Sequence, residues 1–121
     1  YMLQYFQPYA IQVKRIEPAE NIAKTARSRC IDVQCCFFDS ESAKEIASAD
    51  GFYNLVIGNN KWARVPDINS FVERLRLVFC PNGTITMEFP HLMRLMEERQ
   101  FDTIYYEHFH HLPLTTVQKI F

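Results

Sequence analysis

The sequence is poor in glycine, carries almost no net charge and has no long apolar run. Three glycines and six prolines among 121 residues exclude flexible linkers and low-complexity tracts. Lysine and arginine number 13 and aspartate and glutamate 14, a net charge of −1 with neutral histidine, so neither a nucleic-acid partner nor a membrane partner is predicted. No segment approaches the ~18 apolar residues of a membrane span. The remaining composition, 48% apolar and 22% charged, is globular and suits one domain.

Cysteine spacing gives no support to a metal or redox site. None of the four cysteines belongs to a Cys-x-x-Cys pair, and they stand at Cys30, Cys35, Cys36 and Cys80. Zinc ribbons and dithiol motifs therefore lack their local signature. Reduced thiols in a cytoplasmic protein, with no metal, are the prediction.

The hydrophobic pattern alternates between strands and helices. A turn is expected at Pro81-Asn82-Gly83, and the apolar run over residues 53–58 is typical of a parallel strand buried on both faces. This order predicts an α/β fold with a mostly parallel sheet and helices on both faces. Strands are expected over 11–16, 31–38, 53–58 and 84–89, and helices over 2–6 (ended by Pro8), 19–28, 40–48, 68–79, 91–99 and from 115.

Polar residues follow several of the predicted strands, where α/β sheets bind ligands. Glu17 can accept hydrogen bonds from ribose hydroxyls, or it can be a solvated acid in the first turn of the next helix. Asn59 and Asn60 can hold a ligand carboxylate or amide, or they can serve a turn. The predicted carboxyl ends of the strands are Glu17-Pro18, Phe37-Phe38, Asn59-Asn60 and Phe89-Pro90.

The densest group of titratable side chains spans residues 105–111. It holds three of the four histidines, beside Glu107 and two tyrosines. Adjacent glutamate and histidine can form an acid–base pair, since each tunes the other. A metal site is the weaker interpretation, because the segment lacks the i, i+4 histidine pair of a helical zinc motif. A plain amphipathic loop is the other alternative.

The segment over residues 54–109 resembles the sugar C-methyltransferases. It begins NLVIGNN and ends TIYYEHF, and the similarity continues upstream through RIEPAENIAKTAR at 15–27 and FFDSESAKEI at 37–46. These enzymes use S-adenosylmethionine (SAM) to methylate a carbon of nucleotide-linked deoxy keto-sugars. The resemblance covers nearly the whole chain.

The resemblance implies a partial Rossmann-like class I methyltransferase. Residues 1–100 would form a truncated SAM-methyltransferase domain, and residues 101–121 would begin the substrate region. The family's first strand, which carries the Gly-rich loop that binds SAM, would lie before Tyr1. Glu17 would bind the ribose, and the other residues bordering the cofactor would be Pro18, Phe37, Phe38, Asn59 and Asn60.

Three residues of the 105–111 segment match the family's Tyr-x-Glu-His stretch. The resemblance implies that His108 is the general base that removes a proton beside the sugar keto group. Glu107 would orient His108, and Tyr105 would donate a hydrogen bond to the substrate oxygen.

The sequence also departs from the family pattern. Arg64 stands where the family has a histidine, and Tyr106 replaces another histidine. The family's Gly-rich loop and cysteine-rich zinc region are absent, so a central fragment or a divergent copy with weak activity is expected. The alternatives are a non-catalytic nucleotide-binding or protein-interaction module, and a fragment of a nicotinamide-dependent oxidoreductase.

Overall fold

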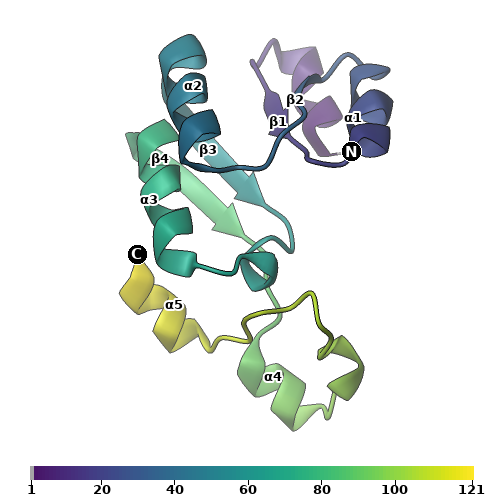
Figure 1. The fold of residues 1–121 in the computed structure, drawn as a ribbon, viewed down its shortest axis with the longest axis vertical. Helices are drawn as coiled ribbons and strands as arrows, with labels where there is room; N and C mark the ends of the chain where they lie inside the picture. The colour runs from purple at the N-terminus through teal and green to yellow at the C-terminus, as the bar shows by residue number, and fades with distance from the viewer. Residues whose placement is uncertain (1) are drawn as a thin grey trace. The chain divides into compact units, whose positions relative to one another are not determined.

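The computed structural model describes residues 2–121. The chain divides into two compact units, Tyr1–Ser42 and Ala43–Phe121 (Figure 1). Both are mixed α/β structures with one two-stranded parallel sheet each. The parallel pairing predicted from the sequence is therefore confirmed, but as two separate pairs of strands. No helix within residues 2–121 is long and apolar enough to cross a bilayer.

The first unit packs one helix against a short parallel pair. Its elements are the 3₁₀ helix η1 (Met2–Tyr9), β1 (Lys14–Ile16), α1 (Glu20–Arg27) and β2 (Asp32–Gln34), followed by the start of α2 (Ser40–Asp50). Ile16 lies opposite Gln34. The buried side chains of α1 are alanines, which allow a helix to approach the strands closely; the core is Ala23, Ala26, Ile31 and Val33, with Leu3 and Cys35 packed on it.

Several boundaries in this unit differ from prediction. The strand predicted over residues 11–16 begins only at Lys14. The first helix does not end before Pro8 but continues through it to Tyr9, as a 3₁₀ helix. It ends where Ala10, in the left-handed region at φ 54°, donates to the Gln7 carbonyl at 3.0 Å. The second strand is shorter than residues 31–38, because the Cys36 N–H bonds the Gln34 carbonyl at 3.2 Å and turns the chain.

The second unit is built on a longer parallel pair. It contains most of α2, then β3 (Tyr53–Gly58), η2 (Trp62–Arg64), α3 (Ile68–Val78), β4 (Phe79–Met87), α4 (Leu92–Glu97), η3 (Phe101–Thr103) and α5 (Leu114–Ile120). Figure 1 shows α3 alongside the β3–β4 pair. Gly58 lies opposite Met87, so both strands end at the same edge of the sheet.

A tryptophan organises the core of this unit. Trp62 is 1% exposed and packs with Val72 of α3 and Val117 of α5. Its ring lies 5.2–6.3 Å from three phenylalanine rings, those of Phe71, Phe89 and Phe121. Because α3, α5 and the end of β4 all meet this one side chain, η2 is held firmly beside the sheet edge.

The predicted turn at residues 81–83 is wrong, since these residues lie inside β4. They are accommodated by a shift in register. Tyr53 of β3 pairs with Phe79 of β4 and Leu55 pairs with Thr84, so that Asn54 alone faces residues 80–83. Gly83 is required there, because a Cβ would stand 2.6 Å from Phe79 Cε2 and 2.8 Å from the Asn54 carbonyl oxygen.

The bounds predicted for β3 are confirmed, but its burial is not. Leu55 is 41% exposed and Asn54 is also exposed, whereas the apolar run predicted burial on both faces. Within residues 2–121, β4 is the one strand that pairs with β3. The described neighbours of β3 therefore cover only part of its apolar side chains.

Candidate functional site

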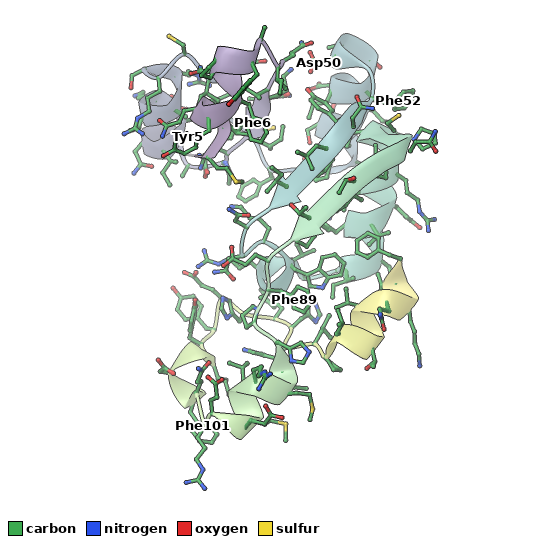
Figure 2. The ribbon with its side chains drawn as sticks, turned by 180° about the vertical axis from the view of Figure 1, so that it is seen from behind. Tyr5, Phe6, Asp50, Phe52, Phe89 and Phe101 are labelled. Atoms are coloured by element: carbon green, nitrogen blue, oxygen red, sulfur yellow. The ribbon has the colours of Figure 1, made fainter. Side chains whose placement is uncertain are left out.

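The candidate site of the second unit forms where β3 and β4 end. The Glu88 N–H donates to the Gly58 carbonyl at 2.9 Å, which continues the pairing one step past β4. Asn60 follows β3 with φ 49°, a left-handed conformation that asparagine tolerates. Asn60 and Glu88 are thereby brought to the same edge of the sheet, and Phe89 lies just beyond β4 (Figure 2).

A cavity of about 290 Å³ opens at this edge. Three of the residues singled out from the sequence, Asn60, Tyr105 and His108, line it. The remaining lining residues are Glu88, Phe89 and Pro90. Asn59, predicted beside Asn60, is exposed and is not among them.

Glu88 is the lining residue that sequence reasoning missed. The sequence predicts a strand end at Phe89-Pro90, whereas β4 ends at Met87 and the acid directly before Phe89 lines the cavity. The signal was present, because a strand end with an acidic residue is the same pattern that singled out Glu17. Glu88 adds a carboxylate to a wall otherwise made of rings and an amide.

Backbone hydrogen bonds dock the loop of residues 105–111 on η2. The Phe109 N–H donates to the Ala63 carbonyl at 2.7 Å, and the His110 N–H reaches the same oxygen at 3.3 Å. His110 Nε2 also lies 3.3 Å from the Pro66 carbonyl oxygen. On the far side, the Leu92 N–H bonds the Leu112 carbonyl at 3.2 Å. The loop is thus attached both to η2 and to the start of α4.

Tyr105 and His108 form a ring pair within this loop. Their ring centroids are 4.2 Å apart, and the His108 N–H donates to the Tyr105 carbonyl at 2.9 Å. The His111 ring lies edge-on to His108, with 5.7 Å between centroids. This turn places a phenol and an imidazole side by side on the cavity wall.

The Glu107 carboxylate contacts Arg64 and Tyr106, whereas its position next to His108 predicts that it orients the His108 ring. Its Oε2 lies 3.1 Å from Arg64 Nη1, and its Oε1 accepts from the Tyr106 hydroxyl at 3.4 Å. The carboxylate is therefore held by η2 and by its own neighbour in the sequence. Arg64, noted only as a departure from the family pattern, proves to contact a candidate site residue.

The first unit presents the other predicted residues at the end of its parallel pair. Glu17 is buried, and its carboxylate accepts from Arg15 Nη2 at 2.6 Å and from the Ala19 N–H at 3.2 Å. Pro18 is exposed, Phe38 is half-buried, and Phe37 after β2 is 75% exposed.

No metal-binding group is formed by residues 2–121: no three histidine, cysteine, aspartate or glutamate side chains there converge as ligands. The cysteines are free. The pKa of the Cys35 thiol is raised, mainly by a hydrogen bond with Glu20 and to a smaller extent by burial. The raised pKa disfavours the thiolate.

Comparison with known proteins finds a similarity to a C-methyltransferase. No family model matches the sequence. The chain is 32% identical over 119 residues to the C-methyltransferase NovU of Streptomyces niveus, a match that covers 98% of the chain. It spans 28% of the length of that relative. The similarity supports a relationship to C-methyltransferases along nearly all of the chain.

Proposed function

We propose that the chain is the central part of a SAM-dependent sugar C-methyltransferase. It would transfer a methyl group to the carbon beside the keto group of a nucleotide-linked deoxy sugar, in the cytoplasm. The observation that carries this proposal is the similarity to NovU over 98% of the chain. The cavity that gathers Asn60, Tyr105 and His108 supports it.

The fold proposed for the whole protein is Rossmann-like. Residues 1–100 would belong to the cofactor domain, without its first strand, and residues 101–121 would begin the substrate region. Each unit has a helix packed on a parallel pair of strands, which is the kind of element pairing from which such a fold is built.

The residues proposed to hold SAM have suitable chemistry. Glu17 is a buried carboxylate that already accepts from two donors, a guanidinium and a backbone N–H, and ribose hydroxyls are donors of the same kind. Phe37 offers an exposed ring for the adenine. Pro18 and Phe38 would also border the cofactor, and Asn59 and Asn60 would meet its methionine end. When bound, SAM supplies an electrophilic methyl group.

The proposed catalytic step is proton removal from the sugar carbon. The imidazole of His108 would take that proton, and the neighbouring Tyr105 hydroxyl would donate to the keto oxygen, where negative charge develops. Glu107 would act indirectly, through the position of the loop, since its carboxylate is bound by Arg64 and Tyr106. This chain alone would have little or no activity.

A second candidate is a nucleotide-binding or protein-interaction module without catalysis. The observation that favours it is the engagement of both proposed acids by arginines, Glu17 by Arg15 and Glu107 by Arg64. A carboxylate that already pairs with an arginine is less available to a ligand or to a catalytic step.

Calorimetric titration with SAM and with S-adenosylhomocysteine separates these functions. The chain is joined to the upstream strand, Gly-rich loop and downstream domain of a relative, and methylation of a nucleotide-linked keto-sugar is measured in parallel. Binding with turnover supports the methyltransferase. Binding without turnover supports the nucleotide-binding module. Failure to bind either ligand contradicts the methyltransferase and leaves the protein-interaction module.

A further inference from the structure

We propose that Arg64 is a positioning residue that holds the loop of residues 105–111 over the cavity through its ion pair with Glu107. The importance of that loop for catalysis rests on the function proposed above. The positioning itself is a property of the free chain, so it can be tested without any ligand or reaction.

The backbone at Arg64 is held in place because the two residues before it in the sequence are buried. Trp62 is 1% exposed and Ala63 is fully buried. The short helix is closed by the Arg64 N–H on the Lys61 carbonyl at 3.1 Å and by the Val65 N–H on the Trp62 carbonyl at 3.3 Å. The exposed guanidinium therefore projects from a backbone that the core keeps in place.

The same helix holds the loop in two chemically different ways. The Ala63 carbonyl accepts from the Phe109 and His110 N–H groups, while the Arg64 side chain binds the Glu107 carboxylate. The backbone bonds hold the loop after His108. The ion pair holds it before His108, so both flanks of the candidate base are attached to η2.

This attachment sets which side chains face the cavity. Glu107 stands between Tyr105 and His108 in the chain and is bound to η2, whereas Tyr105 and His108 line the cavity. Releasing Glu107 would leave the turn that carries these two rings attached to η2 only on its Phe109 side. Arg64 thus fixes the Tyr105–His108 pair without touching the cavity itself.

The ion pair is half-exposed, with 45% of the Arg64 and 42% of the Glu107 side chain accessible. Pairs of this kind add little to global stability and weaken as salt rises. A local effect on loop order, with the fold unchanged, is therefore the signature that distinguishes positioning from a general structural role.

Hydrogen exchange of the Phe109 amide, followed by NMR in the 121-residue chain, reads out this docking directly. Arg64→Gln should speed that exchange by about two- to five-fold, the range that one exposed ion pair supports. Arg64→Lys, which keeps the charge, should retain most of the protection. The exchange of the Leu75 amide in α3 should not change in either variant.

Charge reversal makes the test decisive. Arg64→Glu and Glu107→Arg should each speed Phe109 exchange, and the double variant should restore protection. Arg94→Gln is the control, because it removes another exposed ion pair, 3.0 Å from Glu97 within α4, that does not involve Glu107 or η2. Unchanged Phe109 exchange in Arg64→Gln, no rescue by the double variant, or equal acceleration at Leu75 would each overturn the proposal.

Discussion

The guanidinium of Arg64 binds the carboxylate of Glu107, with 3.1 Å between Nη1 and Oε2. The first residue stands where the family pattern has a histidine, and the second belongs to the stretch that carries the proposed base. The ion pair therefore joins η2 to the loop of residues 105–111.

Glu17→Ala should weaken SAM binding by about ten-fold or more. The protein tested is the chain joined to the upstream strand, Gly-rich loop and downstream domain of a relative, called the completed protein below. A carboxylate accepting ribose hydroxyls contributes on the order of 1.5–3 kcal/mol, and 1.4 kcal/mol is one decade in affinity. Calorimetric titration measures the change. Glu41→Ala, which removes an exposed acid from the first turn of α2, is the control; equal affinities in the parent and Glu17→Ala would remove Glu17 from the site.

Asp67 should make the stability of α3 depend on pH. Hydrogen bonds from the Ser70 hydroxyl and N–H hold the pKa of the Asp67 carboxyl below its ordinary value. A lowered pKa in the folded state means that ionised Asp67 stabilises the fold above the unfolded pKa, and this contribution is lost as pH falls through the lower, folded pKa.

The thermal midpoint of Asp67→Ala, followed by Trp62 fluorescence, should therefore lie below that of the parent at pH 7. The gap should close as pH falls below about 4. Glu73→Ala, an exposed acid on the same helix, is the control. A gap that is the same at pH 7 and at low pH would contradict the role of the ionised cap.

Gly83→Ala should destabilise the second unit by about 1–3 kcal/mol, the usual cost of an overpacked position. The new Cβ would meet Phe79 and the Asn54 carbonyl at the register shift between β3 and β4. Urea unfolding measures the loss. Thr84→Ala, at the exposed neighbouring position, should cost less, and equal costs would show that close approach at Gly83 is unimportant.

Local chemistry explains which elements could be predicted from the sequence. β3 was predicted with its observed bounds, because an apolar run lies between Gly51 and Asn59, and α3 was signalled by Pro66 and Asp67. The turn at residues 81–83 failed, because pairing with β3 overrides local turn preference.

The candidate site was also predictable only in part from the sequence. Strand ends and the family's Tyr-x-Glu-His stretch singled out Asn60, Tyr105 and His108, which share one cavity. The Arg64–Glu107 contact could not be predicted, because it depends on how the Phe109 N–H docks the loop on η2. Contacts between distant segments of this kind are absent from any local pattern.

The turnover of His108→Ala, compared with the parent in the completed protein, tests the central claim most directly. General-base catalysis contributes about 10²–10⁴-fold, so methylation of the keto-sugar should fall by that order. Affinity for SAM should stay nearly the same, because the base acts on the sugar, and Glu107→Gln should cost less than His108→Ala. A completed protein that methylates its sugar equally well with alanine at this position would contradict the account.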